Sequence, residues 1–361
     1  MLYNLLSPLA EDFIFFNLFR YLTFRTGGAI VTSLILCFLI APRLILWLKS
    51  KQAGASNIRA YLEEAHAAKA GTPTMGGLMI LLSVSVSTLL WADLANPLVW
   101  IAMLVMVGYG MIGFADDYLK LTKKNSKGLS GRKKILFQLL IGTVAALGII
   151  ASMPEHLHMH VAIPFFKHFF IYLSWFFIPW VLFVLIGASN AVNLTDGLDG
   201  LAIVPVAICA ASFGLIAYLV GRADFAAYLH IPFVPGTGGL AVLCGALIGG
   251  SMGFLWYNAP PAAIFMGDTG SLAMGGVLAA IAIMTKHELV LAIIGGLFVM
   301  EAVSVILQVA SFKLTGKRMF AMAPIHHHFE KKGWSEPTIV IRFWIIAVVL
   351  ALIGLSTLKL R

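Results

Sequence analysis

The stretch that decides the fold runs from residue 97 to residue 120, PLVWIAMLVMVGYGMIGFADDYLK. Its apolar part is close to the ~20 residues that an α-helix needs to cross the hydrocarbon of a bilayer. Two adjacent aspartates, Asp116 and Asp117, follow where the apolar part ends. Neighbouring carboxylates repel each other, so their presence at the end of a membrane span requires a cause.

The composition of the whole chain indicates a membrane protein. Of the 361 residues, 60% are hydrophobic and 11% are charged, whereas soluble domains carry roughly 25% charged residues. A water-soluble domain could not bury this much apolar surface, so lipid must be the main solvent. The first 25 residues lack the features of a cleaved signal peptide and instead predict an interfacial segment before the first span. The three cysteines lie in apolar runs without metal-ligand spacing, which predicts small buried side chains.

Apolar runs of spanning length predict an all-α bundle of about ten transmembrane helices in a single transmembrane domain, residues 1–361. The predicted spans are 27–48, 73–92, 97–115, 135–152, 169–188, 200–220, 239–257, 262–285, 289–312 and 338–358.

Basic residues predict the orientation of this bundle. They are concentrated in three loops, 49–72, 116–134 and 313–337, whereas the loops of the other side hold only Lys167, Arg222 and Lys286. Positively charged loops stay in the cytoplasm. Ten spans then place both termini in the periplasm. Topology alone accounts for the net charge of +9, and no nucleic-acid partner is expected.

Five carboxylates share the predicted cytoplasmic side: Asp116, Asp117, Asp196, Asp199 and Asp268. Helix capping explains Asp199 and Asp268 as well as function does, and Asp196-Gly197 is an ordinary turn sequence. The pair at 116–117 is harder to dismiss, because a helix C-terminus disfavours acids by ~0.3–1 kcal/mol each. Either Lys120 with its basic neighbours or a metal ion should compensate. Mg²⁺ is the natural ion, because it takes carboxylate and phosphate oxygens.

Two further cytoplasmic segments suit phosphate. KAGTPTMGG, residues 69–77, places Lys69 and Thr74 at a Gly-rich turn that opens a span, where backbone N–H groups can meet phosphate oxygens. A simple proline-initiated helix start explains the same pattern. APIHHHFEKKGW contains His326, His327 and His328, of which one or two are expected to bind phosphate. Glu301 lies inside the ninth run; it is either functional or a bend in the helix.

Carboxylates, lysines and histidines at a lipid surface suit phosphoryl transfer to a lipid, in which the protein positions groups and neutralises charge. The segments GTPTMGG, GFADDYLK, NAVNLTDGLDGLA, FMGDTGSLA and APIHHHFEKKGW resemble, in order and over nearly the whole chain, those of the phospho-N-acetylmuramoyl-pentapeptide-transferase family (bacterial translocase I). The first four have counterparts across the polyprenyl-phosphate N-acetylhexosamine-1-phosphate transferase superfamily, and the histidine-rich segment favours the muramoyl-pentapeptide branch.

The resemblance implies transfer of phospho-MurNAc-pentapeptide from UDP-MurNAc-pentapeptide to undecaprenyl phosphate, giving lipid I and UMP with Mg²⁺ as cofactor. It implies that Asp116 is the base, that Asp268 with Asp117 holds the metal, and that His327 and His328 assist catalysis. The implied substrate-binding residues are Lys69, Thr74, Lys120, Lys133, Asn193, Asp196, Asp199, Asn258, Phe265 and His326, with Phe265 stacking on uracil. It also implies the bacterial cytoplasmic (inner) membrane, an active-site cleft on the cytoplasmic face, contact with membrane lipid and a homodimer.

Two alternatives stay open from the sequence. The sister enzymes that use UDP-N-acetylglucosamine would need the same metal and lipid but a different sugar pocket. A transporter would place its coupling carboxylates near the bilayer midplane, whereas here only Glu301 lies deep in a span.

Overall fold

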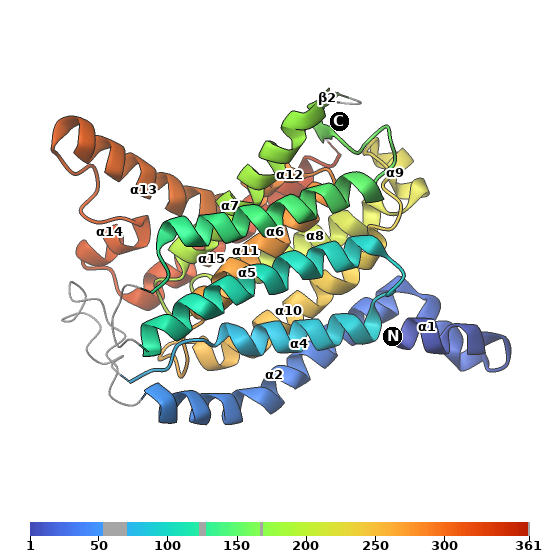
Figure 1. Cartoon of the computed structure of the whole chain (residues 1–361), viewed down its shortest axis with the longest axis horizontal. Helices are drawn as coiled ribbons and strands as arrows, with labels where there is room; N and C mark the ends of the chain where they lie inside the picture. The colour runs from blue at the N-terminus through green and yellow to red at the C-terminus, as the bar shows by residue number, and fades with distance from the viewer. Residues whose placement is uncertain (53–70, 123–127, 167–168, 360–361) are drawn as a thin grey trace.

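The computed structural model describes residues 1–52, 71–122, 128–166 and 169–359. This part of the chain is mostly helical (Figure 1). Nine of its helices are long and apolar enough to cross a membrane, and one further apolar helix, Gly77–Trp91, is shorter. The predicted all-α polytopic membrane fold is therefore confirmed.

The predicted spans correspond to α2 (Leu22–Gln52), α4 (Gly77–Trp91), α5 (Pro97–Thr122), α6 (Gly131–Ser152), α7 (Phe177–Thr195), α8 (Ile203–Val220), α10 (Gly238–Asn258), α11 (Gly267–Met284), α12 (Glu288–Ile294) with α13 (Gly296–Thr315), and α15 (Glu336–Ser356). The remaining helices are short: α1 (Leu2–Leu6), the 3₁₀ turns η1 (Pro8–Glu11), η2 (Ile14–Arg20) and η5 (Ser174–Phe176), α9 (Ala223–Leu229) and α14 (Ile325–Lys331).

The ninth predicted span, 289–312, is not one continuous helix. It divides into α12 and α13 at Gly295, whose backbone leaves the helical range with φ −86° and ψ 19°. Two consecutive glycines stand at this point, and glycine is a common site of helix breaks. Figure 1 shows that α13 projects away from the bundle toward α14.

The two ends of the bundle differ. One end holds the N-terminal segment, α9 and a hairpin of β1 (His160–Ala162) and β2 (Phe170–Tyr172), in which His160 pairs with Tyr172. Near the C-terminus, Lys359 lies over the Tyr228 ring of α9. Both ends of the chain therefore lie at the same end of the bundle, as an even number of spans requires. The opposite end holds α14 and the C-terminus of α5 (Figure 1).

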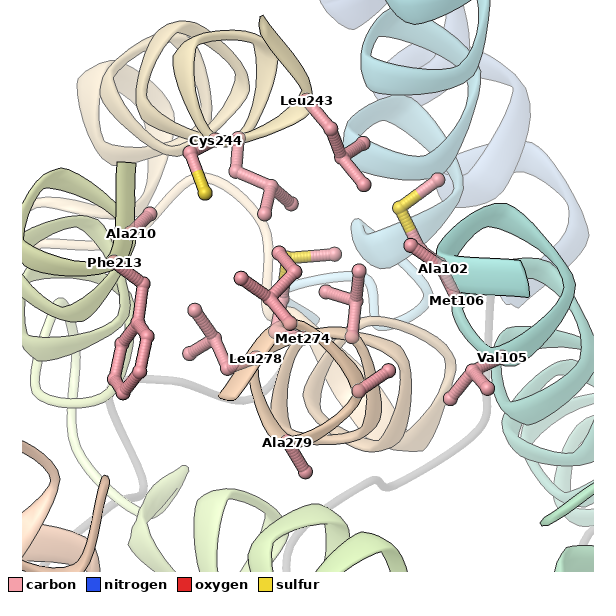
Figure 2. Close-up of a cluster of buried hydrophobic side chains, with 14 of the residues drawn as sticks. Ala102, Val105, Met106, Ala210, Phe213, Leu243, Cys244, Met274, Leu278 and Ala279 are labelled. Atoms are coloured by element: carbon pink, nitrogen blue, oxygen red, sulfur yellow. The ribbon is translucent and has the colours of Figure 1, made fainter. Parts of the chain in front are cut away.

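Helix α11 forms the centre of the core. Every residue from Thr269 to Met284 is buried, and α11 packs against α5, α7, α4 and α8. Figure 2 shows side chains of α11 such as Met274 and Leu278 meeting Phe213 of α8, Leu243 of α10 and Met106 of α5. All three cysteines are free and buried, as predicted.

Two glycines allow other helices to reach the N-terminus of α11. A Cβ atom on Gly113 of α5 would lie 2.1 Å from the Asp268 carbonyl oxygen, and one on Gly77 of α4 would lie 2.1 Å from the Gly270 nitrogen. Close backbone approach through small residues is characteristic of packed membrane helices. It places the aspartate pair of α5 directly beside the first turn of α11.

Candidate active site

Asp117 caps the N-terminus of α11 from the neighbouring helix α5. Its carboxylate accepts the Thr269 backbone N–H at 3.0 Å and the Thr269 hydroxyl at 2.7 Å, and the Asp268 N–H lies 3.4 Å away. The first N–H groups of a helix lack partners within the helix and carry partial positive charge. The amides of α11 therefore supply part of the positive charge that the aspartate pair requires.

Lysines from two helices supply the rest of that charge. The ammonium of Lys120 lies 2.5 Å from Asp116 Oδ2, and that of Lys134 on α6 lies 3.1 Å from the same oxygen. The other oxygen, Oδ1, accepts the Leu129 N–H at 2.6 Å. Asp116 is only 1% exposed, so these contacts compensate a carboxylate removed from water.

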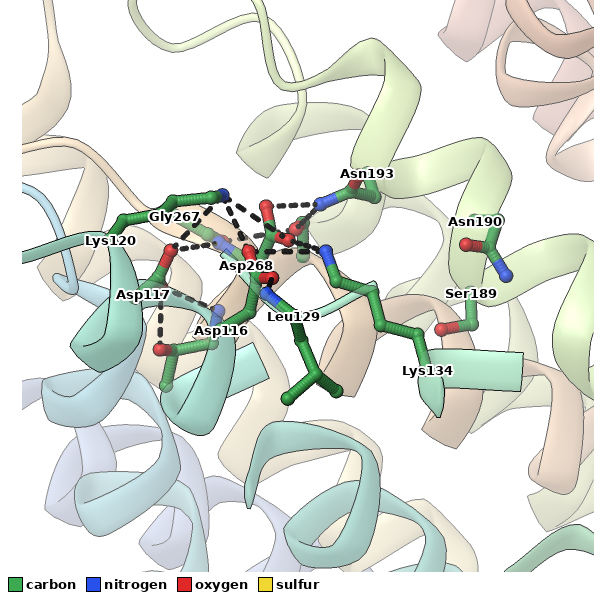
Figure 3. A network of polar contacts seen from close by, with 12 residues as sticks. Asp116, Asp117, Lys120, Leu129, Lys134, Ser189, Asn190, Asn193, Gly267 and Asp268 are labelled. Carbon is green, nitrogen blue, oxygen red and sulfur yellow. Dashed lines mark hydrogen bonds and ion pairs between the residues drawn. The ribbon is translucent and has the colours of Figure 1, made fainter. Parts of the chain in front are cut away.

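Asp268 completes the cluster (Figure 3). Lys134 Nζ lies 2.5 Å from Oδ2, and the Asn193 amide donates to Oδ1 at 3.0 Å. Asn193 also donates to the Ser271 hydroxyl at 2.7 Å. The side chain of Asp268 is 16% exposed, more than those of Asp116 and Asp117, so it is the most accessible carboxylate of the cluster.

The cluster fits a hard divalent cation. Asp116, Asp117 and Asp268 each offer an oxygen, and these oxygens lie within 4.8 Å of one another. Carboxylate oxygens are the ligands that Mg²⁺ prefers, and a site with one or two carboxylates is normally completed by water and phosphate. The donor set therefore fits the metal that the sequence predicts.

A second segment, residues 73–77, pairs with the backbone that leads into α11. Gly76 N–H donates to Phe265 O at 2.8 Å, Gly77 N–H to Met266 O at 2.9 Å, and Phe265 N–H to Pro73 O at 2.8 Å. The Thr74 backbone exchanges two hydrogen bonds with the Gln52 amide. Thr74 and the partly exposed Phe265 are thereby held next to Gly267. Lys69, predicted to bind substrate, lies outside the described residues.

Asn258 and Asp199 brace the loops around the cluster. Asn258 donates to Ile264 O at 2.8 Å and accepts the Gly200 N–H at 2.9 Å. Asp199 accepts the Ala262 N–H at 3.0 Å, while its own N–H donates to Glu336. Both residues are nearly inaccessible. Their contacts fix the segment before Phe265 to the turn after α7.

Asp196 follows α7 and faces the same cluster. Although it keeps some solvent contact, protein surrounds most of the carboxyl group. Burial, and then the negative charges of Asp268 and Asp117, raise the pKa of Asp196 to about 8. The raised pKa favours the protonated form of this carboxyl, which can donate a hydrogen bond.

The three histidines of α14 face different partners. His326 is fully buried, with Nδ1 3.1 Å from Glu301 Oε1, and its ring lies against Gly197. The His327 ring lies 4.1 Å from the His326 ring between centroids, at a tilt of 54°, and His327 contacts Glu330 at 2.5 Å.

His328 instead accepts the Ala321 N–H and packs against Phe320. Glu301, left open by the sequence, is the buried partner of a histidine that contacts the turn after Asp196.

The basic residue of α6 that reaches the cluster is Lys134, whereas the predicted residue was Lys133. Lys133 is exposed in the structure. Residues one apart on a helix point about 100° away from each other, so only one of them can face Asp268. Thr269, Gln52 and Glu336 also contribute contacts to the site, and they were not among the predicted residues. Of these, Thr269 had a signal, because it directly follows Asp268 at a helix start.

Comparison with known families agrees with this geometry. The model of glycosyl transferase family 4 matches residues 99–286, just over half of the chain, and signature 1 of phospho-N-acetylmuramoyl-pentapeptide-transferase matches residues 69–81. The chain belongs to glycosyl transferase family 4. The first match spans the aspartate pair, Asn193 and Asp268, and the second contains Thr74.

Together the two matches confirm the predicted family. Phospho-MurNAc-pentapeptide transfer is the activity that they support, with donor and acceptor following from the family.

Proposed function

We propose that this protein transfers phospho-MurNAc-pentapeptide from UDP-MurNAc-pentapeptide to undecaprenyl phosphate at the cluster of Asp116, Asp117 and Asp268, with Mg²⁺ as cofactor. The observation that carries the proposal is the convergence of three carboxylates and two lysines at the N-terminus of α11. A helix N-terminus and lysines suit phosphate groups, and grouped carboxylates suit the cation that accompanies them.

Asp268 and Asp117 would hold Mg²⁺, consistent with the exposure of Asp268 and the backbone N–H contacts that fix Asp117. A bound Mg²⁺ would neutralise charge on the phosphates as it develops during transfer. Lys120 and Lys134 lie within reach of the same space, and each can exchange a carboxylate contact for a phosphate oxygen when substrate enters.

Asp116 is proposed as the base that removes the remaining proton of undecaprenyl phosphate. An oxygen of that phosphate then attacks the β-phosphorus of the nucleotide sugar, the bond from this phosphorus to the bridging oxygen breaks, and UMP leaves. The protein's part is positioning and charge neutralisation. Contacts with Leu129, Lys120 and Lys134 hold the Asp116 carboxylate in place for this role.

The nucleotide is proposed to lie along the loops at the ends of α7 and α10. Phe265 is partly exposed there and can stack on uracil. Asn193 offers a hydrogen-bond donor, and Asp196 offers one in the protonated form that its raised pKa favours, while Asp199 and Asn258 support the loops. His327 is proposed to assist at the pyrophosphate or sugar. The contacts of His328 with Ala321 and Phe320 favour a supporting role for that residue.

The site is proposed to face the cytoplasm of the bacterial inner membrane. The described lysines and arginines at the ends of α5, α6, α13 and α14 lie at the site's end of the bundle. Such residues remain in the cytoplasm. Both termini then face the periplasm. We propose that the chain forms a single catalytic domain and that two copies form a homodimer.

The test is UMP release by the purified protein in detergent with undecaprenyl phosphate and one sugar nucleotide at a time. UDP-MurNAc-pentapeptide should release UMP, and UDP-N-acetylglucosamine should not. EDTA should abolish release and Mg²⁺ should restore it. Release from UDP-N-acetylglucosamine alone would assign the sister activity, and no release from either would contradict the proposal.

A further inference from the structure

A second polar layer lies in the core beneath the carboxylate cluster. Gln138 of α6 is fully buried, and its amide donates to the Ser189 hydroxyl of α7 at 3.2 Å. Ser189 in turn donates to Leu272 O of α11 at 3.0 Å. The Asn190 amide donates to Gln138 Oε1 at 3.2 Å, and the Tyr109 hydroxyl of α5 donates to Gln138 O at 3.1 Å. The layer therefore joins the four helices that build the site.

Three members of this layer stand one helical turn from a residue of the cluster. Gln138 follows Lys134 by four positions, Ser189 precedes Asn193 by four, and Leu272 follows Asp268 by four. Residues four apart lie above one another on the same helix face. The bonds from Gln138 through Ser189 to Leu272 thus repeat, one turn deeper, the contacts of Lys134, Asp268 and Asn193 (Figure 3).

A repeated layer of this kind fixes the position of each helix along its axis relative to the neighbouring helices. Apolar packing between membrane helices is little stronger than packing against lipid, so small residues and hydrogen bonds between helices set their relative positions. A slide of α6 or α7 along α11 would break the bonds of Gln138 and Ser189. The same slide would remove Lys134 or Asn193 from the two oxygens of Asp268.

We propose that Gln138 and Ser189 are positioning residues that lock α6, α7 and α11 in register, so that Lys134 and Asn193 hold Asp268 in the orientation required for the metal and phosphate. This inference rests on the proposed function. Gln138 and Ser189 are fully buried and lie one helical turn from the carboxylate cluster. Their effect should therefore appear in turnover and in metal binding rather than in recognition of the nucleotide sugar.

The variants Gln138→Leu and Ser189→Ala remove the layer with little change in volume. Matched controls are Thr143→Val on α6 and Ser212→Ala in the core of α8, since each removes a hydroxyl bonded only within its own helix. The measurements are kcat and KM for UMP release, Mn²⁺ binding to substrate-free protein by electron paramagnetic resonance, and the thermal midpoint in detergent.

The lock predicts a roughly tenfold lower kcat and a several-fold weaker Mn²⁺ affinity for each variant of the layer, with KM for the UDP sugar within twofold of the unmodified protein. The double variant should lose less than the sum of the two single losses, because both substitutions remove the same bond between Gln138 and Ser189. Both controls should remain within twofold in kcat and Mn²⁺ affinity. If Gln138→Leu does not fold, Ser189→Ala carries the same prediction.

Unchanged kcat and Mn²⁺ affinity in the layer variants, with only a lower thermal midpoint, would overturn the proposal. Gln138 and Ser189 would then have only a structural role. Equal losses in the controls would overturn the proposal as well. An unmodified protein that releases no UMP would instead refute the proposed function, so the two failures are distinguishable.

Discussion

The substitution Gly113→Ala tests the contact that brings the aspartate pair to α11. The new Cβ would lie 2.1 Å from Asp268 O and 2.5 Å from Thr269 N, whereas ordinary contact begins at 3.4 Å. Both neighbours are backbone atoms, so the two helices must separate by about 1.3 Å locally. The bonds of 2.7 and 3.0 Å from Thr269 to Asp117 would then exceed hydrogen-bonding distance.

A displacement of ~1 Å in a catalytic group can cost ~100-fold in rate, so kcat for UMP release should fall at least that far in Gly113→Ala. The matched control is Gly108→Ala on the same helix, where the three atoms nearest the Cβ all belong to the Ile141 side chain, at 3.0 to 3.5 Å, and none to the backbone; its kcat should stay within about threefold of the unmodified protein. Thr269→Val removes one charge-assisted bond without changing the packing and should cost about tenfold. A Gly113→Ala protein with more than half of the original activity would refute this reasoning.

Three further predictions concern charged side chains. Lys134→Met should lower kcat for UMP release about 100-fold, whereas the exposed Lys133→Met should lower it less than threefold; equal losses would contradict the assignment of Lys134. Glu301→Ala should raise KM for the UDP sugar several-fold, because its histidine partner supports the turn after α7, and an unchanged KM would show that this support is dispensable. Burial lowers the pKa of Lys286 to about 8 and raises that of Glu288 to about 7. The native protein therefore holds more protons than the unfolded chain at Glu288 between pH 4.5 and 7, and fewer at Lys286 between pH 8 and 10.5. The thermal midpoint should therefore fall with pH across the lower range and rise across the upper one, which leaves a minimum a few degrees deep between them. The double variant Lys286→Met with Glu288→Gln should lack this minimum. An unchanged pH profile of the thermal midpoint in the double variant would contradict the prediction.

The spans could be predicted because hydrocarbon thickness sets their length. The break at Gly295 could not, since an apolar run has the same composition whether its helix is straight or divided. The convergence of Asp116, Asp117 and Asp268 followed from their shared side of the membrane. The compensating charge of Lys120 and its basic neighbours was also predicted, and Lys120 and Lys134 do contact Asp116. The contribution of the α11 amides was not predicted, because it comes from backbone groups and not from side chains.

The sequence could not predict which face of each membrane helix points into the protein. Lys133 and Lys134 are adjacent, and lipid-facing positions of α6 such as Leu136 and Leu140 are as apolar as core positions. Without a contrast between polar and apolar faces, periodicity cannot show which side of a membrane helix points inward. The layer of Gln138 and Ser189 was missed for the same reason.

The central claim is that phosphate moves together with the sugar at the carboxylate cluster. The most direct measurement uses UDP-MurNAc-pentapeptide with ³²P in the β-phosphate, undecaprenyl phosphate and the purified protein. We predict that the label enters the organic-soluble lipid, that unlabelled UMP is released in equal amount, and that Asp117→Asn abolishes both. Label that stays in water-soluble UDP, or full transfer by Asp117→Asn, would contradict the account.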